Sequence, residues 1–358
     1  MEGSPIDVVV FAPLAPILGV LLFWFIQLLF IEGEKFLLEQ IRPLHEPLCR
    51  FTNFLGILFQ NICHALGYTI TKSGISDFYI SVNYGRVAPK KEKKGVFEWI
   101  SNAFLFIGPF FIPAFLLLIC LLFLMDGGFS VNIPSNLVDW KYTFSGQMIT
   151  FGNSLYNFSN SFFDFLINID LLNPIHLGFL FVMIFFGMGM RPSYIGEKKQ
   201  EKIDMIYDLR NIWFHIIKKP IYLLILFSFS YLIFYISLFL NQNWYVFLFS
   251  FFGWLSIVSI ISILFANLVL LLIKTTDKIS GVKKIIPYVM IPLVYSLMRL
   301  LFYYFPASFS NSVSLLVTVI LTFVVTLLLF SSDTNKFKSK IRIKFFKRKK
   351  KDKDREDE

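Results

Sequence analysis

The stretch WYVFLFSFFGWLSIVSIISILFANLVLLLI, residues 244–273, runs for 30 positions without a charged side chain. A helix needs about 20 apolar residues to cross the hydrocarbon core of a bilayer. Several other runs in this 358-residue chain are long enough, and 56% of its residues are hydrophobic. In lipid only helices and closed barrels satisfy the backbone, and barrel strands alternate apolar and polar residues. The sequence therefore predicts an all-α polytopic membrane protein.

The apolar runs predict eight transmembrane helices, near residues 8–31, 51–69, 97–125, 171–190, 220–240, 244–273, 285–305 and 312–330. The run at 51–69 is the most polar of them, because Asn53, Gln60, Asn61 and His64 interrupt it. Such side chains in a membrane helix face protein or a cavity rather than lipid. We therefore expect this helix to pack against other parts of the chain.

Lysine and arginine predict the orientation of the helices, because both accumulate in cytoplasmic loops. Every second connection is basic, namely 70–96, 191–219 and 274–284, and so is the C-terminal tail. The connections between them hold only Lys141, namely 126–170, 241–243 and 306–311. This pattern predicts that both termini are cytoplasmic. The connection 32–50 then lies outside, although it carries three basic residues beside four glutamates.

A short region after the second helix has the period of a β-strand. Residues 76–87 read SDFYISVNYGRV, in which Phe78, Ile80, Val82 and Tyr84 alternate with more polar neighbours. Glycine and proline flank the run at turn positions. We expect a short strand or hairpin over 76–88 at the cytoplasmic face, between the second and third helices.

Four regions follow from these patterns. They are a membrane core at 1–190, a cytoplasmic linker at 191–219, four further membrane helices at 220–330, and a charged tail at 331–358. In the linker, Ile203, Ile206, Tyr207 and Trp213 have mostly helical spacing with charges between them. This spacing predicts an amphipathic helix that lies on the membrane or on neighbouring helices.

The net charge of +10 comes largely from the tail, because residues 336–351 contain ten Lys or Arg and no acid. A basic cluster next to the last helix favours anionic lipid, and nucleic acid is the less favoured partner. The residues expected to contact lipid are Lys344, Lys347, Arg348, Lys349, Lys350 and Lys351.

Two further polar residues, Arg299 and Asn267, lie inside other predicted membrane helices. Arg299 needs an acidic partner or must reach the interface with its long side chain, and the candidate partners are Glu32, Glu34, Asp164 and Asp170. Asn267 is interpreted as one end of an interhelical hydrogen bond rather than as part of a transport pathway.

The segment Gln60-Asn61-Ile62-Cys63-His64 stands where a zinc hydrolase would carry His-Glu-x-x-His. Two histidines four residues apart on one helix bind catalytic zinc, and the glutamate acts as general base. Here His64 remains, whereas Gln60 is a poor zinc ligand and the Asn61 amide cannot take a proton from water. We expect neither a catalytic residue nor a bound metal or other cofactor.

The order of features around His64 resembles the site-2-type intramembrane zinc metalloproteases. The similar residues are 60–68 on the helix, 78–87 as the following strand, and Gly108-Pro109 in the next helix, about a third of the chain. The resemblance implies a protease-like membrane core at 1–190 and a strand that pairs with extended clients. It also implies a third ligand, an Asp near an Asn-Pro segment; Asn173-Pro174 and residues 186–190 offer none.

Several functions remain open at this stage. The favoured hypothesis is a catalytically inactive relative that binds or holds transmembrane client proteins through the strand. The alternatives are a channel or transporter, a subunit of a larger membrane complex, and an active metalloprotease with unconventional ligands. A further interpretation is that Gln60, Asn61 and His64 only form an interhelical hydrogen-bond cluster.

Overall fold

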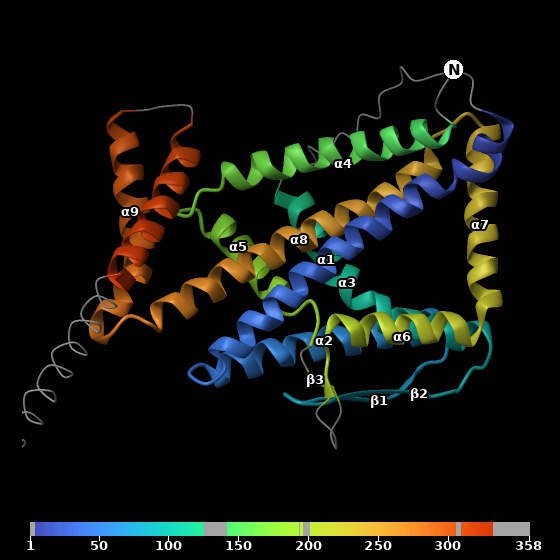
Figure 1. The fold of residues 1–358 in the computed structure, drawn as a ribbon, viewed down its shortest axis with the longest axis horizontal. Helices are drawn as coiled ribbons and strands as arrows, with labels where there is room; N and C mark the ends of the chain where they lie inside the picture. Colours follow the sequence, from blue (N-terminus) through green and yellow to red (C-terminus); the bar gives the residue numbers. More distant parts are fainter. Residues whose placement is uncertain (1–3, 125–141, 193, 196–200, 306–308, 332–358) are drawn as a thin grey trace, which may run out of the picture. The chain divides into compact units, whose positions relative to one another are not determined.

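The computed structural model describes residues 4–124, 142–192, 194–195, 201–305 and 309–331 (Figure 1). The chain forms two compact units. Unit 1 comprises residues 1–166 and 178–270, and unit 2 comprises 167–177 and 271–358. Helices dominate both units, as the sequence predicted.

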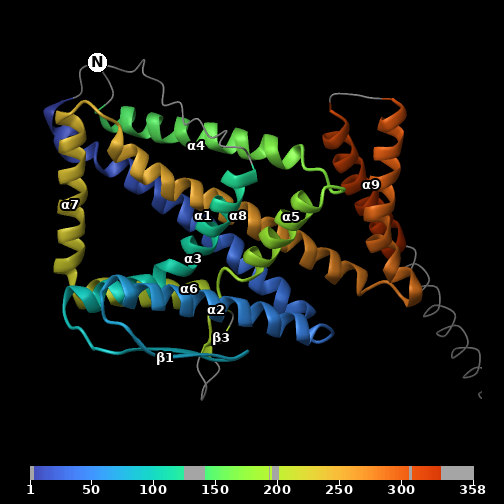
Figure 2. The same cartoon turned by 180° about the vertical axis from the view of Figure 1, so that it is seen from behind.

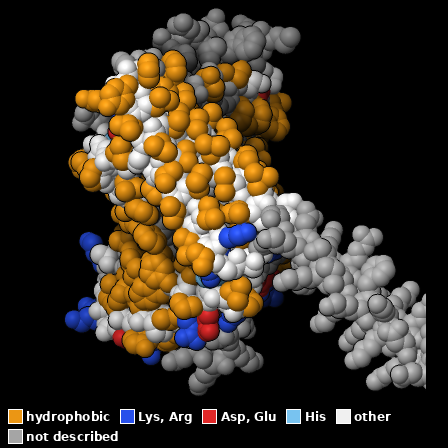
Figure 3. Space-filling model, turned by 90° about the vertical axis from the view of Figure 1, so that its left-hand side faces the viewer, with side chains coloured by type: hydrophobic (Ala, Val, Ile, Leu, Met, Phe, Trp, Pro, Cys, Tyr) orange, Lys and Arg blue, Asp and Glu red, His pale blue; other side chains and the backbone are white. Residues whose placement is uncertain are grey.

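Six helices in the described part of the chain are long and apolar enough to cross a membrane. They are α1 (Leu14–Ile41), α3 (Val96–Leu124), α7 (Pro220–Phe239), α8 (Trp244–Thr276), Gly281–Tyr304 with α9 (Ile286–Tyr304) in it, and Ser310–Ser331. The protein is therefore an integral, multi-pass membrane protein. On the face drawn in Figure 3, hydrophobic side chains cover most of the described surface.

Two expected spans do not meet this standard. The run at 51–69 forms α2 (Glu46–Ile70), which is not among the six helices, and the run at 171–190 forms the 15-residue α5 (Pro174–Met188). At 1.5 Å per residue, α5 covers roughly 22 Å, less than the roughly 30 Å hydrocarbon core. Helix α2 falls short because polar and charged residues recur along it.

The remaining elements are shorter or more amphipathic. They are η1 (Asp7–Phe11), α4 (Phe144–Ile167), α6 (Met205–Lys218), η2 (Gly281–Ile285), and the two-residue strands β3 (Tyr194–Ile195) and β4 (Glu201–Lys202). Helix α6 confirms the helical spacing of the linker. It begins after Asp204, whose carboxylate accepts a hydrogen bond from the Tyr207 N–H at 2.6 Å and so caps the helix.

An antiparallel hairpin confirms the strand period between α2 and α3. It consists of β1 (Ile75–Ile80) and β2 (Gly85–Pro89), with Ile80 opposite Gly85 and an irregularity between Ile75 and Asp77. Both ribbon views place the hairpin along the outer side of α2 (Figure 1, Figure 2). Gly85 allows this close approach, because a Cβ there would overlap the Asn61 amide and the side chain of Ile57.

The hairpin runs back along α2 rather than away from it. The Asn53 amide, near the start of α2, donates to the Val82 carbonyl at 2.8 Å, and the Asn61 amide donates to the Tyr79 carbonyl at 3.0 Å. The polar side chains of Asn53 and Asn61 on α2 thus hold the backbone of the hairpin.

Contacts in unit 1 also correct the placement of residues 32–50 on the side opposite to 191–219. Lys202 forms an ion pair with Glu39, and the Met205 N–H donates to the Glu32 carboxylate at 3.1 Å. These two segments are therefore in contact with each other, which is incompatible with their lying on opposite sides of a membrane.

Candidate functional site

Two positions of the degenerate motif, Asn61 and His64, have different environments on α2. Asn61 is buried and bonded to Tyr79, whereas the His64 ring packs on the Tyr68 ring with centroids 4.3 Å apart. The His64 Nε2 atom is buried and has no hydrogen-bond partner in the described part of the chain. Burial lowers the pKa of His64 to about 4, so the ring is neutral at physiological pH. The Asn61 amide nitrogen therefore bonds to the hairpin, and the His64 Nε2 atom does not share that bond.

Nothing in the described residues brings a ligand set to His64. No group of three or more His, Cys, Asp or Glu side chains there is arranged to hold a metal ion. The neighbouring Cys63 is buried, and burial raises the pKa of its thiol to about 12, opposed in part by the Arg191 charge. A thiol with so high a pKa is protonated and a poor nucleophile or ligand at neutral pH.

The predicted client-binding strand is largely open to its surroundings. Phe78 is 47% exposed and Tyr79 is 52% exposed, and Val82 in the turn is also exposed. Ile80 and Tyr84 are half-buried beside α2. The hairpin thus presents apolar side chains outward while two asparagine side chains of α2 hold its backbone.

A buried ion cluster, formed by Lys35, Arg191 and Asp208, was not anticipated from the sequence. The Arg191 guanidinium donates from Nε at 3.0 Å and from Nη2 at 2.6 Å to Oδ1 of Asp208. The Lys35 Nζ lies 3.8 Å from Oδ2 of the same carboxylate. All three side chains are at most 4% exposed. Arg191 also lies over the ring of Phe110, 5.3 Å from its centroid.

Three different elements supply this cluster. Lys35 is in α1, Asp208 is in α6, and Arg191 follows α5. The chain at Arg191 approaches α2 so closely that a Cβ on Gly56 would overlap the backbone of Pro192. The only sequence signals were an arginine at the end of an apolar run and a lone acid on an amphipathic helix, and neither identifies its partner.

A second buried polar group lies in the helical core of unit 1. The Gln27 amide donates to the Phe110 carbonyl at 2.8 Å and to the Ser259 hydroxyl at 2.6 Å. The Asn267 amide of α8 donates to the Phe30 carbonyl of α1 at 3.3 Å. These bonds link α1 to α3 and α8, so the polar residues of these helices hold the helices together.

In unit 2, Arg299 has an acidic partner. Its Nη2 lies 3.3 Å from Oδ2 of Asp170, and its Nη1 donates to Ser310 at 3.1 Å. The Tyr295 hydroxyl donates to the other oxygen of Asp170 at 3.0 Å. Asp170 was one of four candidate partners. The expected lipid-contacting residues Lys344, Lys347, Arg348, Lys349, Lys350 and Lys351 lie outside the described residues.

Comparison of this chain with protein-family models, with curated proteins and with solved structures found no match.

Proposed function

We propose that this protein is a catalytically inactive membrane protein that binds extended segments of membrane clients at its β1–β2 hairpin. The proposal takes up the resemblance of this chain to the site-2-type intramembrane metalloproteases. Asn61 stands at the position of their general base, and we assign it a structural role instead of a catalytic one. The hydrogen bond from Asn61 to the Tyr79 carbonyl is the observation that carries the proposal.

Asparagine suits this role and excludes the chemical one. Its amide nitrogen donates to the strand, which an ionised glutamate cannot do, because a carboxylate only accepts hydrogen bonds. The amide has no acid–base function at physiological pH. Gln60 and His64 do not belong to any group of three metal-binding side chains among the described residues. These residues therefore do not supply the ligands that hydrolysis by a metal-bound water requires.

The hairpin has the features of a strand that receives another strand. Phe78 and Tyr79 of β1 and Val82 of the turn are exposed hydrophobic side chains of a two-stranded sheet and its connection. A sheet with so few strands leaves backbone donors and acceptors for an added strand, and alternate side chains supply specificity. An extended client segment would gain backbone hydrogen bonds and apolar contact together.

We further infer that α2, α6 and the hairpin lie at the cytoplasmic face, because residues 32–50, 70–96 and 191–219 are basic and meet there. The carbonyls of Val9 and Val10 accept hydrogen bonds from Tyr235 and Tyr231, late in α7. Since α7 starts directly after α6, these residues lie toward the other face. This inference replaces the expected cytoplasmic N-terminus and removes α2 from the eight expected spans. The basic tail is still proposed to be cytoplasmic and to contact anionic lipid.

Site-specific photo-crosslinking in native membranes tests client binding. A photoreactive phenylalanine analogue is placed at Phe78 or Val82, with exposed Tyr156 of α4 as the matched control position. We expect partners that crosslink from 78 and 82 through a common extended segment, and not from 156. Equal crosslinking from all three positions would contradict a specific strand site.

Metal analysis of the purified protein tests the inactive assignment independently. We expect far less than one zinc per chain, and no change on His64→Ala substitution. Stoichiometric zinc that is lost in His64→Ala would overturn the proposal in favour of a hydrolase with unconventional ligands.

A further inference from the structure

A pocket between α3 and α6 shares no residue with the hairpin or with the buried ion cluster. Its volume is about 260 Å³. A single water needs only about 10–15 Å³, so the pocket has room for a large polar group. Its walls come from the first three turns of α3, the last turns of α6 and the residue before α7. Trp99 of α3 holds these helices together, because its ring stacks on His215 of α6 at 5.2 Å and meets the Tyr222 ring of α7 at 5.9 Å.

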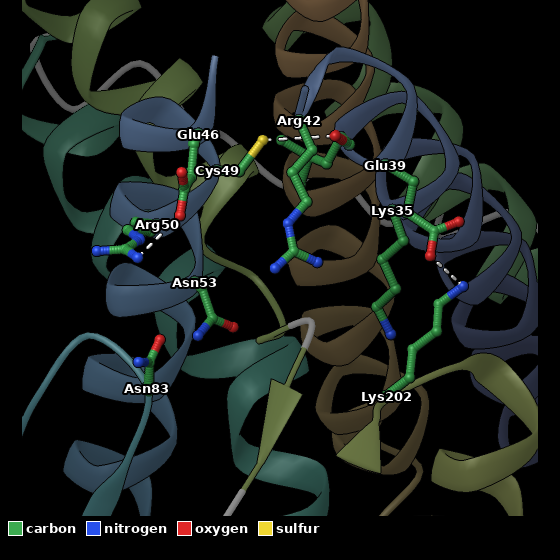
Figure 4. Close-up of a pocket in the computed structure, with 10 residues that line it drawn as sticks. Lys35, Glu39, Arg42, Glu46, Cys49, Arg50, Asn53, Asn83 and Lys202 are labelled. Atoms are coloured by element: carbon green, nitrogen blue, oxygen red, sulfur yellow. Dashed lines mark hydrogen bonds and ion pairs between the residues drawn. The ribbon is translucent and has the colours of Figure 1, made fainter. Parts of the chain in front are cut away.

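The charges of this pocket are arranged differently from those of the smaller pocket in Figure 4. That pocket, of about 80 Å³, lies at the junction of α1 and α2. Its carboxylates are paired within the pocket, Glu39 with Lys202 and Glu46 with Arg50. In the pocket between α3 and α6, by contrast, no described carboxylate forms an ion pair with either of the two lysines.

Positive charge exceeds negative charge in the α3–α6 pocket. Lys218 and Lys219 line it together with one carboxylate, Glu98, so the lining has a net charge of +1. His215 adds no charge at physiological pH, because burial lowers the pKa of its ring below the usual 6.5. Lys218 is exposed, and Lys219 is half-buried with its Nζ over the Tyr222 ring, 5.6 Å from the centroid. Neither lysine side chain is closed off, so both are available to an anionic ligand.

The rest of the lining combines amide groups with aromatic rings. Asn102 of α3 and Asn211 of α6 are both only partly buried. A side-chain amide donates and accepts hydrogen bonds, so this pair suits hydroxyl groups. Phe106 and Phe214 supply apolar surface beside them. The lining therefore matches a ligand that has an oxyanion, hydroxyl groups and an adjoining apolar part.

The start of α7 places this pocket at the edge of the hydrocarbon core. Helix α7 has 20 residues and so covers about 30 Å, the thickness of that core. Lys218 and Lys219 directly precede its first residue, Pro220. Lysines at the ends of membrane helices reach into the headgroup layer, and tryptophans such as Trp99 are enriched there. The ligand with the highest local concentration at this depth is phospholipid.

We propose that this pocket binds the headgroup of an anionic glycerophospholipid. Lys218 and Lys219 contact the phosphodiester, Asn102 and Asn211 bond to hydroxyl groups of the head alcohol, and the acyl chains extend along the apolar helices. Basic pockets between membrane helices bind anionic headgroups by this chemistry. The site does not depend on client binding at the hairpin. A failure of crosslinking there and a failure of lipid binding are therefore separate results.

The test uses the full chain purified in an uncharged detergent. Dihexanoyl phosphatidylglycerol, whose head alcohol carries hydroxyl groups, is titrated against a thermal unfolding signal. Dihexanoyl phosphatidylcholine and inorganic phosphate, at the same ionic strength, are the references. We expect phosphatidylglycerol to stabilise the protein well beyond both. Equal stabilisation by phosphatidylcholine would show that the charge is not recognised, and equal stabilisation by phosphate would assign the site to a free anion; either result overturns the proposal.

The main variant combines Lys218→Gln with Lys219→Gln. We expect its affinity for phosphatidylglycerol to fall at least about tenfold, because two charge-assisted contacts are lost. The matched control combines Lys90→Gln with Lys91→Gln, two adjacent exposed lysines after β2 that do not line the pocket. The basic tail is unchanged in both double variants and cancels in their comparison. Equal losses in the two would indicate general surface charge and would overturn the proposal.

A further variant tests the pocket without changing its charge. Asn102→Leu removes one amide, and we expect the affinity for phosphatidylglycerol to fall about threefold, as for the loss of one hydrogen bond. Thr69→Ala, on the exposed side of α2, is the uncharged control and should leave the affinity unchanged. Unchanged affinity in Asn102→Leu would place the headgroup outside the pocket and would contradict the assignment.

Discussion

Arg191 places two nitrogens on a single carboxylate oxygen of Asp208, and both side chains are almost completely buried. The pair joins the chain after α5 to α6, two segments that also meet Lys35 of α1. A buried ion pair contributes little net stability relative to apolar residues, but breaking it by removing one partner is costly. The main role of the pair is therefore to specify which segments come together, and its net contribution to stability is small.

The first prediction concerns loss of one partner. Asp208→Ala leaves two buried cations without their carboxylate, and we expect the free energy of unfolding to fall by about 3–5 kcal/mol. The double variant Arg191→Met with Asp208→Leu should recover part of that loss, because it removes one of the uncompensated charges together with the carboxylate. Unfolding in mixed micelles with increasing dodecyl sulfate measures both. A double variant less stable than Asp208→Ala would contradict this account.

The second prediction uses the close approach of α2 to the chain after α5. A Cβ at Gly56 would overlap the backbone of Pro192, which cannot rotate away as a side chain can. We expect Gly56→Ala to destabilise the protein by about 1–3 kcal/mol through forced backbone shifts. Gly152→Ala in α4 is the control, because no atom lies within 4 Å of a Cβ there. That control should be neutral or stabilising by up to about 1 kcal/mol, as alanine favours a helix.

A third prediction addresses the attachment of the hairpin. Asn61→Ala and Asn61→Asp both remove the donor to the Tyr79 carbonyl, and each should cost about 1–3 kcal/mol. Hydrogen exchange should quicken over residues 75–89 more than over α3. Thr69→Ala on the exposed side of the same helix is the control. Unchanged exchange in the hairpin of both Asn61 variants would show that this bond does not hold it.

The fourth prediction is a pH dependence carried by His215 of α6. Its ring stacks on Trp99 at 5.2 Å and its Nε2 lies 3.1 Å from the Trp99 carbonyl. Burial lowers the pKa of His215, and Lys218 acts in the same direction, while the Trp99 carbonyl and Glu98 oppose them. The folded protein therefore binds this proton less readily than the unfolded chain does.

Because the folded-state pKa of His215 lies below the usual 6.5, its contribution to stability is present above pH 6.5 and is lost as pH falls through and below that value. Melting temperatures measured between pH 8 and pH 5 should fall more steeply in the native protein than in His215→Gln. The difference between the two proteins isolates His215 from the other histidines. Parallel curves would show that the ring does not respond to pH in this window.

Local patterns were sufficient for six of the eight expected membrane helices, for the hairpin and for α6. Long uncharged runs predicted the membrane helices, as in α8, because crossing lipid depends on the length and hydropathy of one segment. A period of two predicted a strand or hairpin over 76–88, where the structure has a hairpin at 75–89, and helical spacing predicted α6. Each of these properties is decided by neighbours in the chain, so the sequence alone was enough.

Which side chains contact one another was decided only by the tertiary structure. The polar residues of α2 predicted a helix that contacts protein, and only the tertiary structure shows that Asn53 and Asn61 bond to the hairpin. Likewise, no pattern within α1, α5 or α6 could indicate that Lys35, Arg191 and Asp208 meet. An ion pair depends on which segments the chain brings within a few ångströms, and that choice is made by packing across the whole unit.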